Sequence, residues 1–158
     1  MRQSLTLNLR SFIAVVLVNF AVQYLAFRYF RIFDIAPDLT LLFVLYLNLS
    51  FSGITGLIAA FALGLYQDIF FHAVIGGHSI AYLLVAYVAN RLLAEKIELS
   101  VFRTLLFAVY FSLLCAITYQ ALSAPAWGIT LFWKPIIFSV YNGAWSLPAF
   151  YLYHRELA

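Results

Sequence analysis

The sequence predicts an all-α integral membrane protein, a bundle of six transmembrane helices in a single domain over residues 1–158. Of the residues, 66% are hydrophobic and only 9% are charged, whereas roughly a quarter are charged in soluble domains. The mean hydropathy is +0.99. No hydrophilic stretch is long enough to fold by itself, which argues against a soluble catalytic or nucleic-acid-binding module.

Six apolar segments are the expected helices. They cover about residues 11–27, 38–51, 54–72, 79–93, 101–122 and 135–153. The charged N-terminus resembles that of a signal peptide, but no A-x-A-like cleavage site follows, so the first segment is assigned as a membrane helix.

Local signals set several helix ends. Pro37 and Asp38 fit the first turn of the second helix, because proline needs no donor there and an acid favours the positive helix end. This helix is short for a span, about 21 Å, and we prefer a short span to a re-entrant segment. The pair Gly76 and Gly77 should end the third helix, and Ser79 can cap the fourth.

The third helix is interpreted as the packing centre of the protein. From Ile54 to His72 it is roughly 28 Å long, close to the roughly 30 Å of bilayer hydrocarbon. An acid at membrane depth must face the bundle interior, a partner or water. One slowly drifting face carries small and ionisable residues at four-residue steps: Gly56, Ala60, Gly64, Asp68 and His72.

Positive charge predicts the orientation. Six spans put both termini on one side, and that side carries Arg2, Arg10, Arg91, Lys96, Arg103 and Arg155. The other side carries Arg28, Arg31 and Lys134. The excess places both termini in the cytoplasm and gathers Asp38, Asp68, His72 and His78 toward the outer leaflet.

Several polar residues could in principle carry chemistry. Asp68, His72 and His78 could converge on a metal ion, but zinc usually takes three or four well-spaced ligands, so hydrogen bonding to a neighbouring helix is the preferred role. A proton path through Asp68 lacks a second buried acid or lysine. Ser50, Ser52 and Ser79 lack a G-x-S-x-G context, and no phosphate-binding or dinucleotide fingerprint is present. We expect no enzyme activity, cofactor or metal.

The segment from Pro37 to Tyr87 resembles the core of the bacterial rod shape-determining protein MreD family. The pattern is a Pro-Asp followed by leucines, a glycine-punctuated helix with G-L-x-x-D, and a Gly-His turn. It matches at Pro37, Asp38, Gly56, Gly64, Leu65, Asp68, Gly77 and His78. We expect structural or partner-binding roles for these positions, apart from Leu65, and for Ala60.

This resemblance implies a non-enzymatic scaffold in the bacterial inner membrane, part of the rod complex (elongasome) that supports peptidoglycan elongation and cell shape. The implied partners are the bitopic protein MreC, then MreB, RodA and the elongation transpeptidase, within the lipid bilayer and without nucleic acid.

The family in turn resembles the six-helix S components of energy-coupling-factor transporters, so a substrate-binding S component for vitamin or metal uptake is the alternative. S components carry an A-x-x-x-A motif in helix 1. Here that spacing holds Ala14, Val18, Val22 and Ala26, which does not match. The scaffold is therefore favoured.

Overall fold

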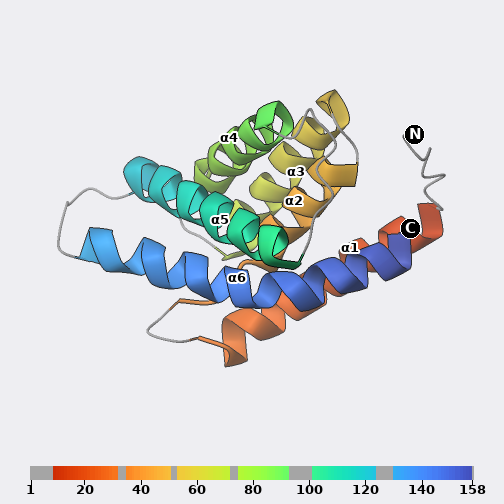
Figure 1. The fold of residues 1–158 in the computed structure, drawn as a ribbon, viewed down its shortest axis with the longest axis horizontal. Coiled ribbons are helices and arrows are strands. Elements are labelled where there is room, and N and C mark those ends of the chain that lie inside the picture. The colour runs from red at the N-terminus through yellow and green to blue at the C-terminus, as the bar shows by residue number, and fades with distance from the viewer. Residues whose placement is uncertain are drawn as a thin grey trace.

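The computed structural model describes residues 9–31, 35–50, 53–71, 75–92, 101–123 and 130–157. Within these ranges the chain forms six helices and no β-strand, which confirms the expected all-α class (Figure 1). The helices are α1 Leu9–Tyr29, α2 Leu39–Ser50, α3 Ile54–Phe71, α4 Gly77–Leu92, α5 Val101–Ser123 and α6 Thr130–Leu157.

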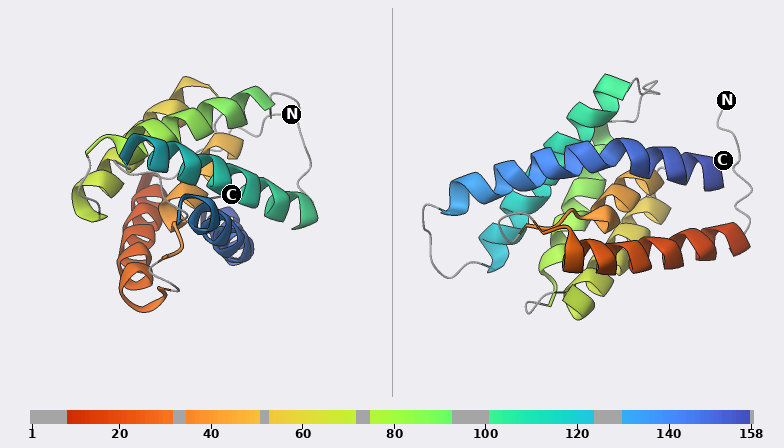
Figure 2. Two further views of the ribbon diagram at one scale, coloured as in Figure 1. Left: turned by 90° about the vertical axis from the view of Figure 1, so that its left-hand side faces the viewer. Right: turned by 90° about the horizontal axis from the view of Figure 1, so that it is seen from below.

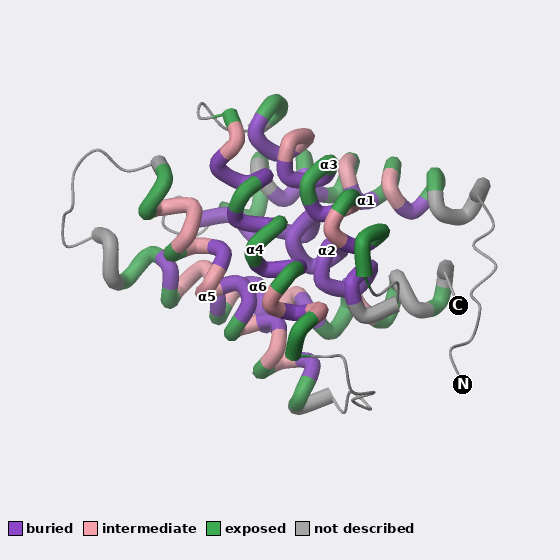
Figure 3. Tube along the Cα trace, turned by 90° about the horizontal axis from the view of Figure 1, so that it is seen from above, coloured by how far each residue is buried: buried purple, intermediate pink, exposed green. Residues whose placement is uncertain are grey.

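The central helix is α2, so the expectation that residues 54–72 form the packing centre is wrong. α2 contacts each of the other five helices, and residues 35–48 are all buried. α3 instead leaves one side open, with Ile58, Phe61 and Ile69 exposed. Both helices are strongly apolar, so composition does not reveal which one is enclosed. Figure 3 shows the burial concentrated along α2 and the helix faces turned toward it.

The other helices surround α2 in the order α3, α4, α5, α6 and α1, each in contact with the next (Figure 2). α1 and α6 run antiparallel as a long pair, so that the start of α1 and the end of α6 lie at the same end of the molecule. Between α1 and α3 the ring is closed by side chains, since Phe20 and Tyr66 stack with their centroids 3.7 Å apart.

The helix α6 begins at Thr130, earlier than the expected start at Pro135. Pro135 and Pro148 both lie inside it. A proline removes one backbone donor, and membrane helices tolerate this where nearby hydroxyls satisfy the freed groups. Ser139 Oγ bonds back to carbonyl oxygens of its own preceding turn, those of Pro135 at 2.8 Å and Ile136 at 2.9 Å, and these are not the carbonyl groups that the two prolines free.

By length and composition, one segment of the described chain could cross a membrane on its own, Arg103–Leu122 in α5. Three further apolar helices in the described ranges are shorter: Ile13–Ala26, Leu39–Asn48 and Ile54–Phe70.

Candidate functional site

The candidate site consists of two helix starts, those of α2 and α4, and of the side chains that bind them. At the start of α2, Asp38 acts as the N-cap, because its Oδ1 accepts a hydrogen bond from the backbone N–H of Leu41 at 2.9 Å. Its other oxygen, Oδ2, accepts a hydrogen bond from the hydroxyl of Tyr82 in α4 at 2.5 Å. Asp38 is 4% exposed, so this carboxylate joins α2 to α4 inside the protein.

Gln23 of α1 holds the same turn from the opposite side. Its Nε2 donates to the carbonyl oxygen of Pro37 at 3.2 Å, and its Oε1 accepts from the backbone N–H of Leu39 at 2.7 Å. Gln23 is fully buried. One amide therefore satisfies a donor and an acceptor that the start of α2 would otherwise leave unpaired.

Asn142 of α6 completes the attachment. Its Oδ1 accepts from the backbone N–H of Asp38 at 2.8 Å, and its Nδ2 donates to Ser112 Oγ of α5 at 3.1 Å. The start of α2 is thus hydrogen-bonded, directly or through one intermediate, to α1, α4, α5 and α6.

The second helix start is capped from a neighbouring helix. Asp68 of α3 is fully buried, and its Oδ1 accepts from the backbone N–H of His78 at 2.9 Å. Its Oδ2 accepts from the backbone N–H groups of Gly76 at 2.9 Å and Ser79 at 3.2 Å, and from Ser79 Oγ at 3.2 Å. The expectation that Ser79 caps this helix is wrong, because α4 begins at Gly77 and Ser79 lies within its first turn.

The imidazole of His78 belongs to this cap. Its Nδ1 lies 2.9 Å from Asp68 Oδ1, and because an ionised carboxylate only accepts, Nδ1 carries the proton in this hydrogen bond. The ring also contacts Tyr82, with centroids 5.7 Å apart, and Tyr119 at 4.0 Å. Tyr82 therefore touches both caps and couples them into one cluster.

Small residues allow α3, which carries Asp68, and α4, whose start Asp68 caps, to approach each other closely. A methyl group on Gly64 would lie 2.5 Å from Ser79 Cα and 2.8 Å from the His78 carbonyl oxygen. Gly56 and Ala60, on the same face of α3, are also buried. Gly77 faces the ring of Tyr119, where an added Cβ would lie 2.8 Å from the nearest ring carbon.

The structure thus brings Asp68, Gly64, Gly77 and His78 together, and it connects them to Pro37 and Asp38 through Tyr82. His72 lies outside the described residues. The sequence alone does not identify Tyr82 and Asn142 as partners of Asp38, or Ser112 as the partner of Asn142. A polar side chain inside an apolar helix is the available signal for Asn142, but nothing in the sequence pairs it with Asp38, which is 104 positions away.

The hydrogen-bonding capacity of both carboxylates is directed at protein donors. Within the described parts of the chain, no group of three His, Cys, Asp or Glu side chains is placed to hold a metal ion. Cys115 is buried and unpaired with another cysteine. The arrangement fixes the relative positions of the helices, because the carboxylates that bind the hydroxyls of Ser79 and Tyr82 also accept the backbone N–H groups of helix starts.

The described parts of the chain thus form an all-helical bundle of six helices joined by buried caps, with large apolar side chains on the outside. The family model for rod shape-determining protein MreD matches residues 3–153. The chain therefore belongs to the MreD family, a family of shape-determining proteins and not a known enzyme family. Searches of curated proteins and of solved structures find no significant match.

Proposed function

We propose that this protein is a non-enzymatic scaffold of the rod complex in the bacterial inner membrane, where it binds MreC and supports cell-wall elongation. Membership of the MreD family over residues 3–153 carries this proposal. The site supports it, because polar groups that could act on a substrate bind helix starts within the protein.

The outer surface supports a membrane-spanning bundle with the S-component-like six-helix arrangement. Large apolar side chains are exposed on all five outer helices, including Leu17, Phe70, Tyr87, Ile117 and Tyr151 at 53–69% exposure. Large apolar side chains exposed on every outer helix are unfavourable in water and suited to lipid. Short helices such as α2 then lie within the bundle, so a helix shorter than the hydrocarbon core is enclosed by longer neighbours.

The topology follows from charge. The excess of Lys and Arg on the side of the termini supports cytoplasmic N- and C-termini. In this orientation the starts of α2 and α4 lie toward the outer leaflet, where Pro37, Asp38, Gly77 and His78 either hold the bundle together or shape the surface that a periplasmic partner meets.

Affinity purification from membranes in mild detergent tests the proposal. Recovery of an MreC-like bitopic protein, together with MreB, RodA or the elongation transpeptidase, supports the scaffold. Recovery of an ATPase module in their place would overturn it in favour of a substrate-binding S component for vitamin or metal uptake. The Asp68→Leu variant provides an internal comparison, because loss of the α4 cap should lower recovery of the partner.

A further inference from the structure

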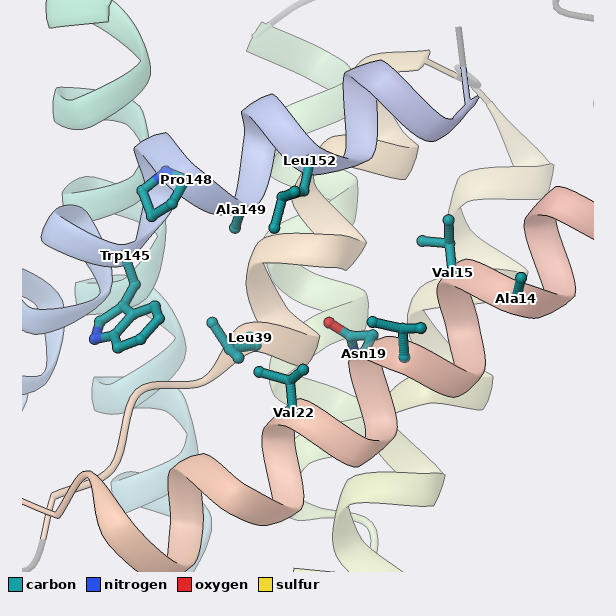
Figure 4. A pocket seen from close by; sticks show the side chains of 10 residues that line it. Ala14, Val15, Asn19, Val22, Leu39, Trp145, Pro148, Ala149 and Leu152 are labelled. Atoms are coloured by element: carbon teal, nitrogen blue, oxygen red, sulfur yellow. The ribbon is translucent and has the colours of Figure 1, made fainter.

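A pocket of about 390 Å³ lies between α1 and α6, beside the start of α2 (Figure 4). Its floor is buried and comes from three helices: Val15 and Asn19 of α1, Leu39 of α2 and Ala149 of α6, each no more than 9% exposed. Its rim is exposed and apolar, with Val18 at 60% and Leu152 at 52%. The pocket therefore opens sideways, onto the surface assigned above to lipid.

The dimensions favour a thin, flexible occupant. A helix is about 10 Å wide, so this volume would hold only about one turn of it. A methylene chain about 4 Å wide, the contact distance of carbon atoms, would fill the same volume over roughly 30 Å. One leaflet provides about half of the roughly 30 Å of bilayer hydrocarbon, so the pocket has room for the acyl chains of one phospholipid.

The positive charge of Arg155, near the opening of the pocket, indicates what kind of lipid headgroup would bind there. Arg155 is exposed and lies three residues after Leu152 on α6, which places it on the same side of the helix about 4.5 Å further along the axis. It lies toward the end of the bundle that holds the chain termini, the cytoplasmic end in the proposed topology. The cytoplasmic leaflet carries anionic lipids, which attract Lys and Arg near the surface.

From this geometry we infer that the pocket between α1 and α6 binds an anionic phospholipid of the cytoplasmic leaflet, with its phosphate beside Arg155, its acyl chains along Ala149 and the ends of these chains at Leu39, the first residue of α2. The site rests on the membrane-spanning topology proposed above. It borders the start of α2 at Leu39, whose backbone N–H binds Gln23, and it thereby links a lipid to the central helix.

Trp145 lines the pocket and serves as the reporter. Replacing the other two tryptophans, Trp127→Phe and Trp133→Phe, leaves it as the sole tryptophan. The protein is reconstituted in vesicles that contain phosphatidylglycerol or phosphatidylcholine with brominated acyl chains, which quench tryptophan fluorescence on contact. We compare the mole fraction of each brominated lipid at which half of the Trp145 fluorescence is quenched. This mole fraction should be at least about twofold lower for phosphatidylglycerol than for phosphatidylcholine.

Two variants on α1 form a matched pair. Val18→Phe adds bulk at the exposed rim and should remove the preference for the anionic lipid, whereas Ala21→Phe, an exposed position outside the pocket lining, should keep it. Ala149→Phe fills the floor and should act like Val18→Phe. Arg155→Gln should abolish the headgroup preference while quenching by both lipids persists.

Equal quenching curves for the two lipids in the parent protein, or the same response in Val18→Phe and Ala21→Phe, would overturn the site and leave ordinary lipid contact. No quenching at all would overturn it in favour of a pocket closed to lipid, for example by a second copy of the chain. The assay contains no partner protein, so its failure leaves the rod-complex proposal standing, and failed recovery of partners leaves the lipid site standing.

Discussion

The carboxylate of Asp68 in α3 caps the first turn of α4, where one of its oxygens receives both the backbone N–H and the ring Nδ1 of His78, each at 2.9 Å. Two helices that are adjacent in sequence are thereby locked at one end by a single buried side chain.

Two substitutions of Asp68 should distinguish a role in hydrogen bonding from a role in proton transport. Asp68→Leu leaves three backbone N–H groups without their acceptor, at about 1–3 kcal/mol for each buried donor, and should greatly lower the melting temperature in detergent. Asp68→Asn keeps one acceptor oxygen and should be intermediate in stability, in MreC recovery and in rod-shape complementation. Ile69→Leu, at the exposed neighbouring position, should behave as the parent.

A proton pathway through Asp68 makes a different prediction, because an amide cannot titrate. In that case both variants would lose shape function completely while the complex with MreC stayed intact in both. That result would contradict the structural role.

Gly64 should not accept any side chain. Its missing Cβ faces backbone atoms of Ser79 and His78, which cannot rotate away, so even Gly64→Ala should lower the melting temperature and Gly64→Leu should prevent recovery of folded protein. The control is Ala62→Leu, an exposed position on the same helix. Equal melting temperatures for Gly64→Leu and Ala62→Leu would show that α3 and α4 are not in close contact.

Gln23 should contribute to stability although it lies far from both acids in sequence. Gln23→Leu preserves much of the volume but strands the Pro37 carbonyl and the Leu39 N–H, and we expect a loss of about 2 kcal/mol or more. The exposed neighbour Tyr24 supplies the comparison, since Tyr24→Leu should change stability little. Thermal unfolding followed by circular dichroism in detergent measures both, and indistinguishable curves for the two variants would show that the hydrogen bonds of Gln23 do not stabilise the start of α2.

The proposed topology predicts that both termini are cytoplasmic. Reporter fusions at Ala158 and near Ala126 should therefore label opposite sides of the membrane, because α6 lies between them. Fusion after Arg155 serves as a second cytoplasmic point. Labels on the same side at 126 and 158 would rule out the six-span arrangement.

The sequence predicts the features that depend on local pattern. Apolar length indicates six helices, the glycine pair predicts the break before α4, where Gly76 has a φ of 98°, and the four-residue series predicts that Gly64 and Asp68 face inward. Each of these follows from a period or a turn that neighbouring residues establish.

Features that depend on how helices are rotated against each other were not predictable. Tyr82 looks like any aromatic residue of an apolar helix until α4 packs with that side toward Asp38, 44 positions away. The enclosure of α2 is hidden for the same reason, because α2 and α3 are similarly apolar. The hydrophobicity of a side chain indicates that it avoids water, but it does not show whether the side chain contacts protein or lipid.

The shortness of α2 bears on how the chain enters the membrane. Its 12 residues extend only about 18 Å, well short of the roughly 30 Å of hydrocarbon, so it gains little by partitioning alone. Its polar start also depends on residues as late in the chain as Asn142. Stable insertion of α2 should therefore wait until α6 has been synthesised, and ribosome-bound intermediates that end before α6 should leave this early segment accessible to water-soluble labels.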